Sequence, residues 1–182
     1  MSQGELHMHY VCTRDEALEL VKGRERFFVY DCGCRTAKGG CTRSRSDVCL
    51  FFAGGDGTGE SAPKEIAKAD VDEIFREADE KKLVARPFRN KERTETDGIC
   101  FCCDDCCGYF LNAEEEHCDK GALIEETSYF DCTDCGDCIP ICHFGARRID
   151  DGALEVNRDK CFGCGLCAQV CPEDCIDLVP RG

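Results

Sequence analysis

The feature that most constrains this chain is a spacing of four cysteines that occurs twice. Residues 132–142 read CTDCGDCIPIC, and residues 161–171 read CFGCGLCAQVC. The chain has 20 cysteines among its 182 residues, a density that in a short secreted protein indicates a disulfide framework. The opening MSQGELHMHY lacks the charged and then apolar pattern of a signal peptide. We therefore expect a protein of the reducing cytoplasm, where thiols stay free or bind metal.

Thiolates are soft ligands that suit zinc or iron–sulfur clusters, and their spacing helps to distinguish the two. Zinc ribbons usually present their cysteines as two pairs. Each repeat here presents three cysteines separated by two residues, and then a fourth cysteine after three more residues. In such a run the first three thiolates bind one cluster and the fourth binds another. The doubled run therefore favours two iron–sulfur clusters over a structural zinc site.

Residues 128–182 resemble a bacterial-type 2[4Fe–4S] ferredoxin domain in all eight cysteines, in Gly136 and Gly165, and in Pro172. The resemblance implies that one [4Fe–4S] cluster binds to Cys132, Cys135, Cys138 and Cys171. It implies that the second [4Fe–4S] cluster binds to Cys161, Cys164, Cys167 and Cys142. It also implies a compact pseudo-twofold fold, in which two short strand pairs and two helices pack against the clusters.

One position departs from that family. The first run is followed by His143, where the family usually has proline. An imidazole changes charge near neutrality, so a histidine beside a cluster would couple the potential of that cluster to pH. The alternative is a surface residue at a turn.

Local patterns predict several elements. Thr13 with Glu16, and Asp70 with Glu73, are capping-box patterns that open helices. The strand-like FFVY leads into a cysteine-bearing loop that ends in the turn-rich AGGDGTGES. The segment GICFCCDDCCGYF is too dense in cysteine to predict an ordinary strand or helix. DDG at residues 150–152 predicts a hairpin.

The predicted fold class is α+β in two domains. Residues 128–182 are the dicluster ferredoxin domain, and residues 1–127 are a small, loop-rich, cysteine-rich α+β domain. The first domain resembles an uncharacterised cysteine-rich module that is fused ahead of ferredoxin domains. The resemblance depends on CGCR, two spaced cysteines, a glycine-rich break, an acidic helix and CxCCxxCC, in that order. The usual module has a GLVH-like sequence and ends in three cysteines, where this chain has KLVARP and CCG.

Nine cysteines of the first domain are candidates for a further metal site: Cys32, Cys34, Cys41, Cys49, Cys100, Cys102, Cys103, Cys106 and Cys107. Successive side chains tend to point apart, so adjacent cysteines contribute to different sites. A third iron–sulfur cluster or a zinc site would use four of the nine. A redox-active disulfide is the other alternative. The leftover cysteines, Cys12, Cys118 and Cys175, are expected to be ordinary buried or free thiols.

Four basic residues are interleaved with the first of these cysteines: Arg35, Lys38, Arg43 and Arg45. Nearby cations lower the pKa of a thiol and favour metal binding or reactivity. The same residues could dock an acidic partner, or form a solvated loop with no special role. The sequence leaves these three interpretations open.

The formal net charge of −14 disfavours nucleic acid and anionic membranes as partners. No stretch approaches the roughly 18 apolar residues of a membrane helix, and there is no P-loop, GxGxxG or Ser–His–Asp signature.

We expect a low-potential electron carrier or electron-wiring subunit of anaerobic metabolism, rather than a stand-alone enzyme. Its expected partners are redox proteins with basic docking surfaces. Two alternatives remain. One is a reductase or reductase subunit whose N-terminal cysteines reduce thiols, disulfides or a substrate, and the other is a zinc-stabilised interaction subunit of a larger oxidoreductase.

Overall fold

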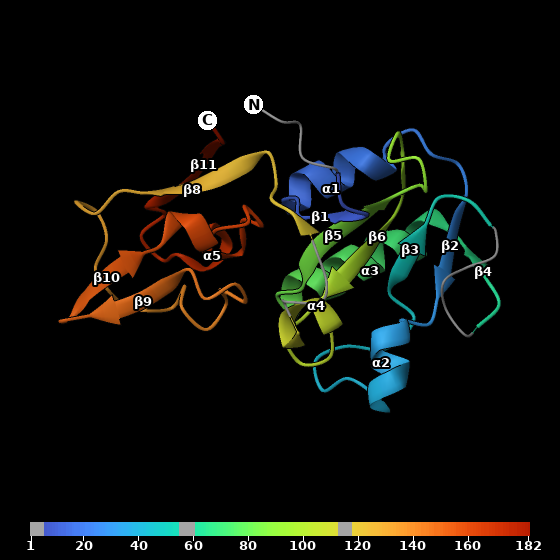
Figure 1. Cartoon of the computed structure of the whole chain (residues 1–182), viewed down its shortest axis with the longest axis horizontal. Helices are drawn as coiled ribbons and strands as arrows, with labels where there is room; N and C mark the ends of the chain where they lie inside the picture. The colour runs from blue at the N-terminus through green and yellow to red at the C-terminus, as the bar shows by residue number, and fades with distance from the viewer. Residues whose placement is uncertain (1–5, 55–60, 113–117) are drawn as a thin grey trace.

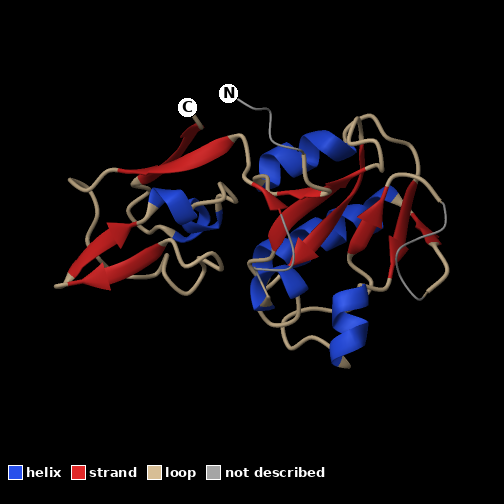
Figure 2. Cartoon of the chain, in the orientation of Figure 1, coloured by secondary structure: helices blue, strands red, loops and turns tan. Residues whose placement is uncertain are grey.

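The computed structural model describes residues 6–54, 61–112 and 118–182, and its elements form a larger front unit and a smaller C-terminal unit (Figure 1). Most of the predicted glycine-rich turn, residues 55–60, lies outside the described residues. Figure 2 shows that both units mix helices and strands. The α+β prediction is therefore confirmed at this coarse level.

The front unit is built on a sheet of seven strands in the order β4-β2-β3-β6-β5-β1-β7. The strands are β1 (His9–Tyr10), β2 (Phe27–Tyr30), β3 (Cys49–Phe51), β4 (Lys64–Ile66), β5 (Val84–Arg89), β6 (Thr96–Cys102) and β7 (Cys118–Asp119). Neighbouring strands are antiparallel, except that β1 and β7 run parallel. β2 confirms the strand predicted from FFVY.

Helices α1 (Arg14–Val21) and α3 (Lys68–Glu80) contribute the apolar side chains that cover one face of this sheet. The predicted capping box at Thr13 and Glu16 is present, with Thr13 as the N-cap of α1. The second capping interaction, predicted at Asp70 and Glu73, is formed one turn earlier, between Ala67 and Asp70. Helix α3 begins after Ala67, and Asp70 lies in its first turn, where its carboxylate accepts the Ala67 N–H at 2.9 Å. The helix gains one more turn because this carboxylate stabilises its exposed N-terminus.

The cysteine-dense segment is an ordinary strand followed by a short helix, which corrects the sequence prediction. β6 includes Cys100 and Cys102, and α4 (Gly108–Leu111) follows the turn after it. Ile99 and Phe101 pack into the main core, so the alternating cysteines face the opposite side of the sheet. The predicted cysteine loop likewise contains a short helix, α2 (Gly33–Lys38), which lies at the same end of the sheet as α4 (Figure 1).

The C-terminal unit has two antiparallel strand pairs. β8 (Leu123–Thr127) pairs with β11 (Ile176–Pro180), and β9 (Arg147–Asp150) pairs with β10 (Ala153–Val156). The DDG hairpin is confirmed, because Asp151 and Gly152 both have positive φ, at 47° and 83°. A 3-10 turn (Arg158–Lys160) precedes the second cysteine run.

The described part of this unit has one α-helix, α5 (Leu166–Val170), where the resemblance implied two. Residues 137–141, which follow Gly136 as α5 follows Gly165, form turns instead. The division at residues 127 and 128 stays a prediction, although β8 ends at that border and pairs with the last strand of the chain. In the described ranges every helix is too short or too polar to cross a membrane.

Candidate metal centres

Two cavities in the C-terminal unit are each lined by four of the predicted ligands. Cavity 1 includes Cys132, Cys135, Cys138 and Cys171 among its lining residues. Cavity 2 includes Cys142, Cys161, Cys164 and Cys167. Each cavity thus combines three thiols of one run with the last thiol of the other, the exchange that the spacing predicts. All 20 cysteines, which all lie in described residues, are free thiols.

Apolar side chains and backbone turns complete these cavities. Phe144 and Phe162 line cavity 2, and Leu154 and Ile176 line cavity 1. Burial of the Cys164 thiol raises its pKa to about 12. Metal binding there therefore has to displace a tightly held proton. The donor set and its apolar shell fit iron–sulfur clusters.

The loops between the thiols need glycine. Gly136 and Gly165 have φ of 81° and 76°, in the left-handed region where a side chain would be strained. Gly163 has φ of 79°, and a Cβ there would collide with the backbone oxygen of Leu123 on β8. The loop of cavity 2 therefore approaches β8 closely only because residue 163 is glycine.

A buried ion pair lies next to both cavities. Arg147 donates to the Glu125 carboxylate at 2.7 Å and to Cys138 Sγ at 3.6 Å. The Arg147 and Glu125 side chains are 1% and 4% exposed. Both residues also line cavity 2. A fixed positive charge here stabilises negative charge in either cavity, a feature that the sequence did not reveal.

Cys175 was set aside as a leftover thiol, yet it lines cavity 1. Its Sγ atom lies 3.4 Å from Cys171 Sγ. The only available signal was its position four residues after the last cysteine of the second run. Cys12 is buried in the main core, as expected, while Cys118 is partly buried.

The nine candidate cysteines of the front unit separate into two groups. In the first, which we call the three-thiol group, Cys41 Sγ lies 3.5 Å from Cys103 Sγ, and Cys103 Sγ lies 3.7 Å from Cys106 Sγ. Tetrahedral zinc with bonds of about 2.3 Å to sulfur separates its ligand sulfurs by about 3.8 Å. The spacing of the three-thiol group fits a single zinc ion. The second group consists of the six other thiols.

The basic residues near these thiols have partners inside the unit. Arg35 is 1% exposed and donates to the backbone oxygen of Phe101 at 2.9 Å. Lys38 pairs with Asp105, and Arg43 pairs with Asp104, each at 2.7 Å. The interpretation as a solvated loop is therefore wrong for Arg35, which the turn carries inward.

His143 is not a surface residue. Its side chain is 1% exposed, its Nε2 lies 3.0 Å from the backbone oxygen of Lys82, and its Nδ1 lies 3.4 Å from Asp104 Oδ1. Lys82 and Asp104 belong to the front unit. The loop after Cys142 thus packs against that unit, a long-range contact that the sequence did not indicate.

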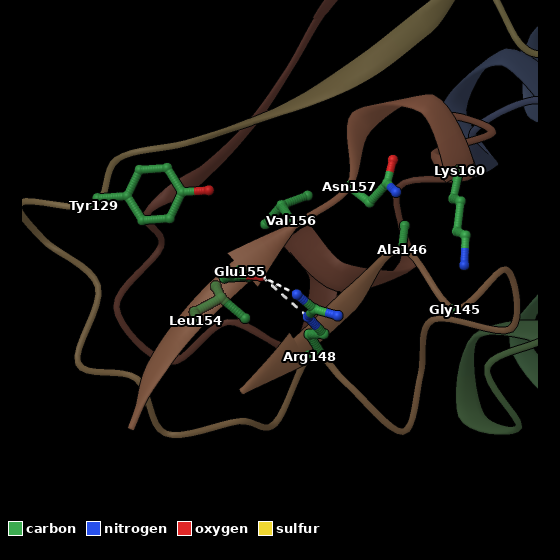
Figure 3. A pocket seen from close by; sticks show the side chains of 9 residues that line it. All are labelled: Tyr129, Gly145, Ala146, Arg148, Leu154, Glu155, Val156, Asn157 and Lys160. Atoms are coloured by element: carbon green, nitrogen blue, oxygen red, sulfur yellow. Dashed lines mark hydrogen bonds and ion pairs between the residues drawn. The ribbon is translucent and has the colours of Figure 1, made fainter. Parts of the chain in front are cut away.

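The C-terminal unit also has a more open surface pocket beside the β9–β10 hairpin (Figure 3). Arg148 Nε donates to Glu155 Oε2 at 3.0 Å across the hairpin, and Tyr129 lies over the other side of the pocket. The residues that line this pocket include no cysteine. This pocket therefore offers no thiol ligand for a metal centre.

Comparison with known proteins agrees with this geometry. Residues 131–176, which include all eight cysteines of the two runs, match the family described as 4Fe-4S dicluster domain. The C-terminal part of the chain is therefore similar to iron–sulfur ferredoxin domains. The family match does not extend to the front unit.

Several curated proteins are similar to part of the chain. A subunit of the ion-translocating oxidoreductase complex of Methanosarcina acetivorans is 33% identical over 60 residues, which cover 33% of this chain and 23% of that protein. Pyruvate synthase subunit PorD of Thermotoga maritima is 42% identical over 51 residues, which cover 28% of this chain and 52% of that protein. An uncharacterized ferredoxin of Methanocaldococcus jannaschii is 34% identical over 79 residues, which cover 40% of this chain and 47% of that protein. The match thus spans less than two thirds of each relative.

Proposed function

We propose that the protein is a low-potential electron carrier or electron-wiring subunit with two [4Fe–4S] clusters. One is bound by Cys132, Cys135, Cys138 and Cys171, and the other by Cys161, Cys164, Cys167 and Cys142. The single observation that carries the proposal is that each of two separate cavities is lined by one of these sets. Relatives that are named as subunits of oxidoreductases support a role in transferring electrons to a redox partner.

Each cluster, when bound, takes up and releases one electron. The thiolates hold it in place, and Phe144, Phe162 and Ile176 keep water away, which limits the reorganisation that accompanies a change of charge. Arg147 supplies a fixed positive charge next to both cavities. With a net charge of −14, we expect the protein to dock on redox partners that have basic surfaces, and to work in the cytoplasm.

The cluster ligands can be tested by counting metal and sulfide. Full-length protein purified without oxygen should contain at least about eight iron and eight acid-labile sulfide per chain, the content of two [4Fe–4S] clusters. Cys135→Ser and Cys164→Ser should each lose about four of both, because each removes one thiolate from one cavity. The measurement is iron and sulfide analysis of the purified variants.

Cys175→Ser is the matched control, because Cys175 lines cavity 1 but lies outside the proposed ligand set. We expect it to retain both clusters. If Cys175→Ser loses a cluster and Cys135→Ser does not, the ligand assignment for cavity 1 is wrong. Material without iron, or with the C-terminal cysteines joined in disulfides, would refute the whole proposal.

A second candidate function for the front unit is favoured by the three-thiol group. Its sulfur spacing suits a zinc ion that would stabilise the unit as an interaction module. Three protein ligands leave a fourth position on zinc for water or another donor. This proposal predicts one zinc per chain that Cys41→Ser releases while the iron content stays unchanged.

A further inference from the structure

We propose that the six remaining thiols of the front unit form the binding site of an additional iron–sulfur cluster, next to cavity 2. The six, which we call the thiol ring, are Cys32, Cys34, Cys107, Cys102, Cys100 and Cys49. Each thiol lies near enough to the next, and the last to the first, to shift its pKa. The family match at residues 131–176 does not include these residues.

The fold brings these thiols together from four places in the chain. The register that pairs Leu50 with Ile99 sets Cys49 opposite Cys100 on neighbouring strands β3 and β6. Cys102 follows on the same face of β6. Cys32 and Cys107 are the N-cap residues of α2 and α4, and Cys34 lies in the first turn of α2. The three strand thiols therefore lie on the sheet face opposite the main core, and the other three come from the first turns of two short helices.

The width of the thiol ring favours a cluster over a single ion. Among the described residues, only the three-thiol group brings three possible ligand atoms within 4.8 Å of one another. Sulfurs around one zinc ion would all be separated by about 3.8 Å, so the thiol ring is too open for that coordination. In an iron–sulfur cluster each thiolate can bind a different iron, with sulfides between them, so the ligand sulfurs lie farther apart. A subset of the six would serve as ligands.

Charge at the thiol ring also suits an anionic centre. Arg86 on β5 is 3% exposed, and its Nη1 donates to Cys107 Sγ at 3.0 Å and lies 3.9 Å from Cys102 Sγ. A fixed positive charge in a medium of low dielectric constant stabilises nearby negative charge. The guanidinium would therefore lower the cost of burying the thiolates around a cluster.

Aromatic side chains connect the thiol ring to cavity 2. The Arg86 guanidinium lies 4.7 Å from the ring centroid of Tyr109, which follows Cys107 by two residues in the chain. Tyr109 meets Phe162 with 5.9 Å between centroids, and Phe162 stacks on Phe144 at 4.5 Å. Both phenylalanines line cavity 2. An electron that leaves one centre would therefore reduce the other through packed side chains, with no bond made or broken. This connection depends on the proposed cluster in cavity 2, whereas the thiol ring site does not.

Metal analysis of the full-length chain, purified without oxygen, tests the proposal. Eight thiolates in cavities 1 and 2 account for about eight iron and eight sulfide, so the wild-type protein should exceed this content, reaching about twelve of each if the extra cluster is [4Fe–4S]. The double variant Cys34→Ser, Cys100→Ser should fall to about eight of each. Electron paramagnetic resonance of the reduced protein should show that the signal from cavity 2 becomes narrower in this variant, because a neighbouring paramagnetic centre is lost.

Two control variants make the result specific. Cys118→Ser removes a partly buried thiol outside the thiol ring and should keep the full iron content. Cys41→Ser disrupts the three-thiol group and should also keep it. A wild-type count of about eight that the double variant leaves unchanged would overturn the inference while the proposed function stands. Loss of zinc rather than iron from the double variant would overturn it too. A wild-type content of about four irons per chain, all lost in the double variant, would refute the proposed function with two clusters. It would still support a cluster at the thiol ring.

Discussion

At the scale of single residues, buried charges distinguish this protein from a simple arrangement of cysteine ligands. Arg147 and Arg86 are each buried and each donate to a thiol, one beside cavities 1 and 2 and one at the thiol ring. A positive charge in a medium of low dielectric constant acts strongly on its neighbours. We expect these two arginines to set the reduction potentials of the centres they touch.

The variant Arg147→Met tests this at cavities 1 and 2. It leaves the Glu125 carboxylate buried without its buried cationic partner, which should cost about 3–5 kcal/mol of stability. Loss of the positive charge should also lower the reduction potential of the C-terminal clusters, because their reduced, more negative state is less stabilised. Thermal unfolding and protein-film voltammetry measure the two effects.

Arg148→Met is the matched control, since Arg148 is the next residue along β9 and pairs with Glu155 while it is 69% exposed. Exposed pairs contribute about 0–1 kcal/mol, so both the unfolding midpoint and the potentials should stay near those of the wild type. Equal effects of the two variants would show that the buried pair has no special role.

At the scale of elements, a single close approach joins the second cysteine run to β8. Gly163 combines φ of 79° with a position against the Leu123 carbonyl group. Gly136 has a similar φ of 81°, but its nearest neighbour for an added Cβ is a flexible side-chain atom of Ile139 at 3.7 Å. A side chain at residue 136 would therefore cause backbone strain alone, whereas a side chain at residue 163 would cause both backbone strain and a steric collision.

Replacement of each glycine by alanine should reveal that difference. Gly136→Ala should cost about 1–2 kcal/mol from the left-handed conformation alone. Gly163→Ala should cost more and reduce the iron bound in cavity 2, because the loop has to move away from β8. Thermal unfolding with iron analysis measures both. The interpretation fails if Gly136→Ala is the more damaging of the two.

At the scale of the whole molecule, aromatic packing holds the two units together. Phe144 of the C-terminal unit contacts Phe110 and Tyr109 of the front unit, with centroids 5.2 and 6.3 Å apart. His143 adds its contact with Lys82. The C-terminal unit is therefore fixed against the front unit at cavity 2.

Phe144→Ala should weaken this interface by about 3 kcal/mol, since it removes a large apolar side chain from packed surroundings. We expect the front and C-terminal units of the variant to unfold in two separate thermal steps, as calorimetry can measure. Phe130→Ala is the control, because Phe130 belongs to the same unit but is 98% exposed, and it should leave the unfolding profile unchanged. A single unchanged transition in Phe144→Ala would contradict this account of the interface.

Local chemistry explains which features the sequence predicted. The capping box at Thr13, the strand at residues 27–30 and the turn at Asp151 and Gly152 depend on residues that are close together in the chain. The two cysteine runs belong to the same class, because three of four ligands come from one short loop. Each of these signals can be read without knowledge of the rest of the fold.

The sequence by itself thus determined an iron–sulfur ferredoxin domain, through the spacing of its thiols. Only the tertiary structure decided how the front cysteines divide, because that depends on the register that sets Cys49 opposite Cys100 and on the turns that carry Cys41 to Cys103. It also decided that Arg86 and Arg147 are buried. Such contacts join residues far apart in the chain, and their energy comes from packing that no local pattern records.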